Sequence, residues 1–93
     1  MYKIEYLLKY VSNDTYKKIL KKSDYVKQRL EKNYIDVDLN IRYLIKYGIT
    51  NIDIVVYNML EELLNYHNDF INYIKEYEKK LNKQEVIMLL ENL

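Results

Sequence analysis

The amino-acid sequence predicts an all-α fold, a compact bundle of six short helices with a seventh helix at the C-terminal end. Apolar residues recur at helical spacing along the whole chain, whereas the period-two alternation typical of strands is nowhere sustained. Ser, Thr, Asn and Asp stand where helices are expected to begin, in a chain with no proline and one glycine. The 93 residues are expected to form one domain, with a six-helix core over 2–80 and the extra helix over 83–92.

Three short helices are predicted in the first third of the chain. An apolar stripe at i, i+3, i+4 and i+7 predicts the first helix over about residues 2–11, from Ile4, Leu7, Leu8 and Val11. A second helix is expected after the capping Ser12, and a third after Ser23. One continuous helix over 14–33 is the alternative.

The fourth and fifth helices are predicted to meet at a glycine. We expect the fourth helix to begin at the N-cap Asp36 and to end at Gly48, in a left-handed C-terminal cap. Thr50 is expected to cap the next helix, with Asp53 in the place of the capping-box acid. Two isoleucines are expected to form the hydrophobic staple beside this cap, Ile49 and Ile54.

The second half of the chain is less clearly divided. Residues 51–80 are expected to form either one long helix or two, and the polar cluster at 65–69 is the place for a break. The last helix is expected over about 83–91, because Asn82 and Glu85 make a capping box. No internal repeat is found.

Composition argues against most kinds of chemistry. A chain without cysteine has no disulfide framework, zinc-thiolate site or thiol nucleophile, and no glycine-rich phosphate loop is present. His67, the only histidine, is expected to pack beside the core rather than to bind a metal. No apolar run is long enough for a membrane span, and a cytoplasmic location is expected. We expect no enzymatic activity, no cofactor and no metal.

The net charge of +1 hides an uneven distribution. Residues 1–35 hold nine Lys and Arg against four Asp and Glu, and residues 36–93 hold six against ten. The basic set crowds the predicted second and third helices: Lys17, Lys18, Lys21, Lys22, Lys27 and Arg29. The acidic set belongs to the fifth and sixth: Asp53, Glu61, Glu62 and Asp69. We expect these two sets to form opposite-signed faces that dock a protein partner or a second copy of the chain.

Several segments carry a family resemblance. Residues 7–20 are similar to the first two helices of pyrin and death effector domains, and residues 44–64 to the fourth and fifth helices of death effector domains. Four residues stand at or near the positions of that family's motif and its acidic partner: Asp14, His67, Asp69 and Phe70. The chain therefore resembles the death-fold superfamily, although His67 replaces the motif arginine, and Lys21 and Lys22 stand in the region of an apolar patch.

This resemblance implies a protein-interaction domain that acts through homotypic contacts in apoptosis or innate immune signalling. The implied partner is a host death-fold protein or a second copy of the chain, and a viral domain of this kind would act as an inhibitor in the host cytoplasm. The alternative is a small viral, phage or plasmid regulator that inhibits a host enzyme or nucleoprotein complex, or that binds DNA through a helix-turn-helix over 40–57. Nucleic acid is not the expected partner, because residues 51–55 carry no Lys or Arg.

Overall fold

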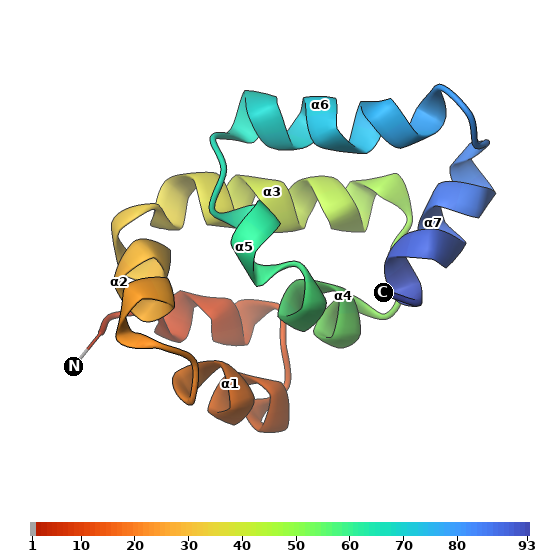
Figure 1. The fold of residues 1–93 in the computed structure, drawn as a ribbon. Helices are drawn as coiled ribbons and strands as arrows, with labels where there is room; N and C mark the ends of the chain where they lie inside the picture. Colours follow the sequence, from red (N-terminus) through yellow and green to blue (C-terminus); the bar gives the residue numbers. More distant parts are fainter. Residues whose placement is uncertain (1) are drawn as a thin grey trace.

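The computed structural model describes residues 2–93, and every regular element in that range is a helix (Figure 1). The elements are η1 (a 3₁₀ helix, Glu5–Lys9), α1 (Asn13–Leu20), α2 (Asp24–Lys32), α3 (Tyr34–Tyr47), α4 (Ile52–Asn58), α5 (Leu60–Leu63), α6 (His67–Glu78) and α7 (Lys83–Glu91). The predicted all-α fold with a C-terminal helix is confirmed.

Helix α3 is the centre of the arrangement. It packs against α2, α4, α5 and α6, and Figure 1 shows α6 lying beside it in the same direction. The buried apolar side chains form one cluster to which every helix contributes, and Leu44 of α3 and Phe70 of α6 are fully buried in it. Because the neighbours cover only part of α3, its remaining face is open to solvent.

Several predicted boundaries are confirmed by their hydrogen bonds. The hydroxyl of Ser12 accepts the N–H of Thr15, and that of Ser23 accepts the N–H of Val26, each at 3.3 Å. Helices α1 and α2 are therefore separate, and the alternative of one helix over 14–33 is wrong.

The predicted caps at Gly48 and Asn82 are also present. Gly48 has φ +119°, and the N–H of Ile49 donates to the carbonyl of Leu44, which makes a Schellman cap at the end of α3. At α7, Asn82 and Glu85 bond each other's backbone N–H at 2.9 Å, as a capping box requires.

The first and middle helices differ from prediction. In place of a helix over 2–11 there is the five-residue η1, and Leu8 is exposed instead of joining the buried stripe. Residues 51–80 contain three helices, so the single long helix is wrong: α4 ends near Met59, and a second break follows α5 at 64–66. The predicted staple is also wrong, because Ile54 is exposed.

The predicted N-cap Asp36 and the predicted capping-box acid Asp53 are both wrong, because their carboxylates bond other helices. Helix α3 begins at Tyr34, directly after α2, so Asp36 lies inside it. The Asp36 carboxylate instead accepts the N–H of His67, the first residue of α6, at 3.0 Å. Asp53 likewise forms no capping box within α4, since it accepts the N–H of Ser12 at 3.0 Å.

Thr50 does not cap α4 either, because that helix begins at Ile52. The N–H groups of Thr50 and Asn51 both donate to the carboxylate of Glu91 in α7, at 3.0 and 3.1 Å. Carboxylates from a different helix therefore bind the N-terminal ends of α1, α4 and α6.

The chain contains an internal repeat, contrary to the sequence analysis. Two seven-residue segments, 4–10 and 41–47, share the pattern Ile-x-Tyr-Leu-x-Lys-Tyr. The equivalent pairs are Ile4 and Ile41, Tyr6 and Tyr43, Leu7 and Leu44, Lys9 and Lys46, and Tyr10 and Tyr47. Ile4, Leu7, Ile41 and Leu44 are fully buried, whereas Leu8 and Ile45, which also correspond, are exposed. Each segment is followed by a short helix, α1 or α4. We call each segment together with the helix that follows it a repeat unit, residues 4–20 and 41–58, although 4–10 contains the 3₁₀ helix η1 and 41–47 is the end of α3.

The polar contacts of the two segments correspond as well. The hydroxyl of Tyr10 donates to Asp38 at 2.6 Å, and that of the equivalent Tyr47 donates to Glu78 at 3.0 Å. The turn after each segment is bound by a carboxylate that comes later in the chain, Asp53 in the first case and Glu91 in the second. The two segments are therefore similar in the polar contacts and burial of their equivalent residues as well as in sequence.

Candidate protein-interaction site

The solvent-facing side of α3 carries apolar side chains that a core would normally take up. Ile35 is 60% exposed, Leu39 37% and Ile45 44%, and Tyr34 at the start of the helix is also exposed. Contiguous exposed apolar surface of this kind marks interaction sites in many proteins. We call this face of α3, from Tyr34 to Lys46, the α3 surface.

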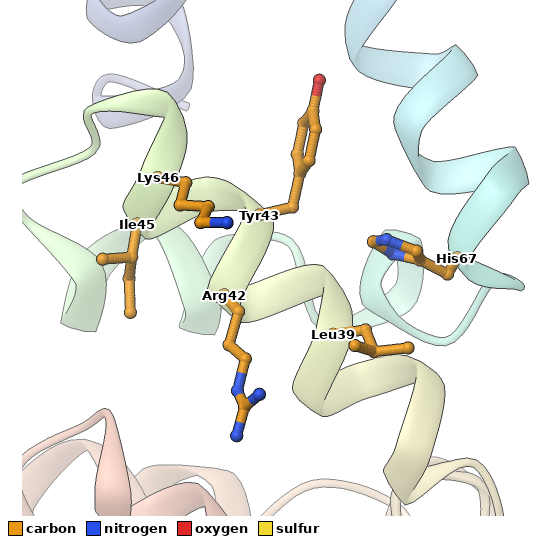
Figure 2. Close-up of a pocket in the computed structure, with 6 residues that line it drawn as sticks. All are labelled: Leu39, Arg42, Tyr43, Ile45, Lys46 and His67. Atoms are coloured by element: carbon orange, nitrogen blue, oxygen red, sulfur yellow. The ribbon is translucent and has the colours of Figure 1, made fainter.

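Two grooves lie along the α3 surface. The first, of about 460 Å³, lies between α3 and the start of α6 and is lined by Leu39, Arg42, Tyr43, Ile45, Lys46 and His67 (Figure 2). The second, of about 300 Å³, lies between α3 and η1 and is lined by Tyr6, Lys9, Tyr34, Ile35, Asp38 and Leu39. Because Leu39 lines both, the two grooves adjoin.

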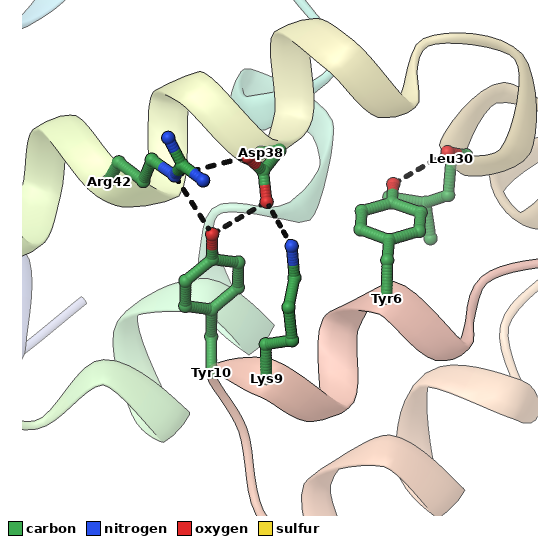
Figure 3. A network of polar contacts seen from close by, with 6 residues as sticks. All are labelled: Tyr6, Lys9, Tyr10, Leu30, Asp38 and Arg42. Atoms are coloured by element: carbon green, nitrogen blue, oxygen red, sulfur yellow. Dashed lines mark hydrogen bonds and ion pairs between the residues drawn. The ribbon is translucent and has the colours of Figure 1, made fainter.

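A polar network connects η1 to the middle of the α3 surface (Figure 3). Asp38 accepts the Tyr10 hydroxyl and forms ion pairs at 3.2 Å with Lys9 and with Arg42. The Arg42 guanidinium also donates to the Tyr10 hydroxyl at 3.3 Å. Partial burial raises the pKa of Asp38, but the bonds from Tyr10 and Lys9 and the two positive charges outweigh it, so the pKa lies below its usual value. The carboxylate therefore stays ionised and fixes both cations beside the grooves.

His67 lies at the other border of the α3 surface. Its Nδ1 is 2.8 Å from the side-chain oxygen of the buried Asn40, and an amide oxygen only accepts, so Nδ1 carries the proton. Tyr43 meets the imidazole edge-to-face, with ring centroids 6.3 Å apart. His67 therefore packs beside the core, as predicted, and it shapes the wall of the first groove. Nowhere in residues 2–93 do three His, Cys, Asp or Glu side chains converge as a metal site requires.

Half of the predicted basic set is occupied by contacts within the chain. Lys22 lies over the ring of Tyr57, Lys27 donates to the carbonyl of Leu20 at 2.9 Å, and Arg29 donates to the hydroxyl of Tyr25 at 2.8 Å. The exposed members are Lys17 and Lys18 of α1 and its C-cap residue Lys21, which we call the α1 lysines.

The predicted acidic set adjoins the basic set rather than facing away from it. Lys22 lines the same recess as Glu61 and Glu62, and Arg29 lines another with Asp69. Asp53 is half-buried and bonded to Ser12 and Thr15 of the α1 turn. Opposite charges so close together cancel much of each other's field beyond a Debye length of ~8–10 Å. The two-faced docking mode stays a prediction, with the α1 lysines as its exposed part.

The family-motif positions do not come together as the resemblance implies. Phe70 is buried in the core and Asp69 is exposed on α6, while Asp14 is exposed on α1. His67 takes its polar contacts from Asn40 and Asp36 of α3. The resemblance to death effector domains stays a prediction, without a His67–Asp14 contact to support it.

The predicted helix-turn-helix is present as α3, the Gly48 turn and α4. Helix α4 buries Val55 and Val56 and, from Ile52 to Asn58, has no Lys or Arg. Phosphate contacts require cations on the helix that enters the groove, so this pair is poorly suited to DNA. No helix within residues 2–93 combines the length and the apolar character that crossing a bilayer requires.

The α3 surface was missed by the sequence analysis. Helical periodicity places Ile45 in one apolar stripe with Val37, Ile41 and Leu44, and this stripe alone predicts an ordinary amphipathic helix. The signal that could have found it is the second apolar row, Ile35 and Leu39, at a spacing of four residues on the side that also carries Arg42 and Lys46.

Comparisons of the chain with protein-family models, curated proteins and solved structures give no match. The case for a function is therefore built on the geometry and charge of the α3 surface.

Proposed function

We propose that this protein acts by binding another protein through the α3 surface and performs no chemistry of its own. The observation that carries the proposal is the set of exposed aliphatic side chains on α3, with Ile35 and Leu39 on one face and Ile45 at its border, beside two adjoining grooves. Full burial of such a side chain is worth about 1.5–3 kcal/mol, and a partner that covers the set gains part of this free energy.

The chemistry of the grooves supports binding rather than catalysis. The lining is apolar and aromatic, with cations at its borders and one carboxylate, Asp38, that is already bonded to Tyr10, Lys9 and Arg42. The His67 Nδ1 is bonded to Asn40, and no nucleophilic Ser, Thr or Cys lines either groove. A host death-fold protein or a second copy of the chain remains within the class of partner proposed.

Site-specific photo-crosslinking in the organism that makes the protein tests this function. A photoreactive amino acid placed at Leu39 is expected to form covalent adducts with a small set of proteins, and the change Ile45→Glu on the same surface should abolish them. The matched control places the photoreactive group at Leu20 of α1, which is equally exposed at 40%.

The following results would count against the proposal. The crosslinked proteins at position 39 could be the same as those at position 20, or they could persist with Ile45→Glu. Either result would show that the α3 surface has no partner of its own. Adducts made mainly with nucleic acid would favour the helix-turn-helix instead. Charge reversal at Lys17, Lys18 and Lys21 should leave the Leu39 adducts unchanged. Loss of these adducts would show that the partner docks on the basic set instead.

A further inference from the structure

The two grooves of the α3 surface share one pair of equivalent residues from the internal repeat. The second groove is lined by Tyr6 and Lys9, and the first by Tyr43 and Lys46, which stand at the same two positions of the repeated segment. Leu39 separates the grooves and belongs to both. The repeat therefore gives two neighbouring subsites with the same Tyr and Lys at their walls.

The spacing of the subsites sets the geometry of an occupant. The α3 residues that line them are centred about seven positions apart, which is roughly 10 Å along a helix that rises 1.5 Å per residue. In a partner helix, side chains at i and i+7 lie on one face and are separated by the same ~10 Å. In a strand, side chains on one face are separated by about 7 or 13 Å, which matches the spacing along α3 less well.

The charge of the α3 surface favours an acidic occupant. Three cations border the grooves, Lys9, Arg42 and Lys46, against the single carboxylate of Asp38. Both oxygens of Asp38 are engaged, one by Lys9 and Tyr10 and the other by Arg42. Lys46 is exposed and takes part in no ion pair within the described residues, 2–93.

We infer that the α3 surface binds an acidic amphipathic helix of a partner protein, which inserts two apolar side chains seven residues apart into the two grooves. Carboxylates on the borders of that helix pair with Lys9, Arg42 and Lys46. This mode of docking, a helix that lays its apolar face in a groove, is one of the recurring forms of peptide recognition. The inference rests on the proposed function and specifies the partner of the same site.

Designed peptides test the inference on the intact protein. The probe is a Glu-rich helical peptide with leucine at positions i and i+7 of one face, and its binding is measured by isothermal titration calorimetry. One comparison peptide has the leucines at i and i+5, which lie on different faces, and another replaces each Glu by Lys. The first peptide is expected to bind at least about tenfold more tightly than either comparison peptide, and less tightly at high salt.

Variants of the protein locate the binding. Lys46→Glu and Leu39→Glu are each expected to weaken binding of the acidic peptide at least about fivefold, because they remove a charge contact and the wall between the grooves. Lys17→Glu and Leu20→Glu make the same chemical changes at exposed positions of α1 and should have little effect. Circular dichroism checks that all four variants fold.

The outcomes separate this inference from the proposed function. Two results would overturn the inference, because each would indicate unspecific charge attraction. One is equal affinity for the i+7 and i+5 peptides. The other is an equal loss of peptide affinity with Lys46→Glu and with Lys17→Glu. If no designed peptide binds while the Leu39 crosslinks still form in cells, the surface binds a partner of another shape and the proposed function stands. If both experiments fail, both conclusions are wrong.

Discussion

Asn40 is the most buried polar side chain of the fold, and it joins three segments. Its amide nitrogen donates to the carbonyls of Leu63 and Asn65, at 3.0 and 3.1 Å, and its oxygen accepts from His67 at 2.8 Å. These bonds hold the connection between α5 and α6 against α3. Through His67 they also fix one wall of the first groove.

Replacing this amide is expected to be costly. Asn40→Ala leaves two backbone carbonyls without this donor and should lower the free energy of unfolding by about 2–3 kcal/mol. The control, Asn72→Ala on the exposed side of α6, should change it by less than ~0.5 kcal/mol. Urea denaturation followed by circular dichroism measures both. A loss below ~1 kcal/mol for Asn40→Ala would show that the bonds contribute little.

Within residues 2–93, Gly48 is the one position where the backbone requires glycine. Its φ of +119° is a conformation that other residues rarely adopt, and an added Cβ would lie 3.0 Å from Cδ1 of Ile87. Gly48→Ala is therefore expected to lower the free energy of unfolding by about 1–2 kcal/mol, measured by thermal and urea denaturation. An unchanged stability would mean that the Schellman cap rearranges without cost.

At the scale of the helices, carboxylates hold neighbouring elements together by binding their N-terminal ends. Hydrogen bonds from Ser12, and then from Thr15, lower the pKa of Asp53, and partial burial opposes them. The backbone N–H groups of Asn51 and Thr50 lower the pKa of Glu91 in the same way. Such bonds use donors that a helix cannot satisfy within itself.

These contacts predict loss of stability in acid. The folded protein holds the pKa values of Asp53 and Glu91 below those of the unfolded chain. Their contribution to the free energy of unfolding is therefore complete above the unfolded pKa, near 4. It is lost as the pH falls through the lower pKa values of the folded protein. Asp53→Ala and Glu91→Ala should each cost about 1 kcal/mol at pH 7, as an N-cap does, and the difference from wild type should shrink toward pH 2.

Denaturation curves at several pH values check this expectation. Glu76→Ala is the control, since Glu76 is exposed and forms only a surface ion pair with Lys79. If the two variants differ from wild type equally at pH 7 and pH 2, packing rather than the carboxylate charge explains their effect.

The sequence predicts local caps better than contacts between helices. Ser12, Ser23, Gly48 and Asn82 act within about three residues, and their spacing in the sequence is enough to predict them. Asp36, Asp53 and Glu91 stand in sequence contexts that also suit local roles or a solvent-exposed position. Their actual partners are about 30 to 40 residues away in the chain, and only the tertiary fold brings these groups together.

At the scale of the whole molecule, one apolar core joins both repeat units. Leu7 and Leu44, at equivalent positions of the repeat, are both fully buried in the same cluster. Leu7→Ala and Leu44→Ala should each lower the free energy of unfolding by about 2–5 kcal/mol, and each variant should still unfold in one transition. Circular dichroism and tyrosine fluorescence measure the transition together. Two separated transitions in Leu7→Ala would show that the first unit unfolds alone.

The binding surface is harder to predict from the sequence than the fold. The neighbours that pack on α3 decide which of its apolar side chains are buried, as Ile41 and Leu44 are, and which are exposed, as Leu39 and Ile45 are. Helical periodicity alone does not show which side chains remain exposed. The charge asymmetry of the sequence points instead to the cations of α1 and α2. Folding pairs Lys22, Lys27 and Arg29 with groups of the same chain, and it places Lys9 and Lys46 beside the open grooves.

Amide chemical shifts of isotope-labelled protein, recorded while the acidic i and i+7 peptide is added, test the central claim most directly. We expect the shifts to change along the α3 surface, at Ile35, Leu39 and Lys46, and at Lys9 of η1, and to stay unchanged around Lys17 and Leu20 of α1. The changes should disappear with Leu39→Glu. Changes centred on the α1 lysines, or no change along α3 at saturating peptide, would contradict the assignment of the α3 surface as the docking site.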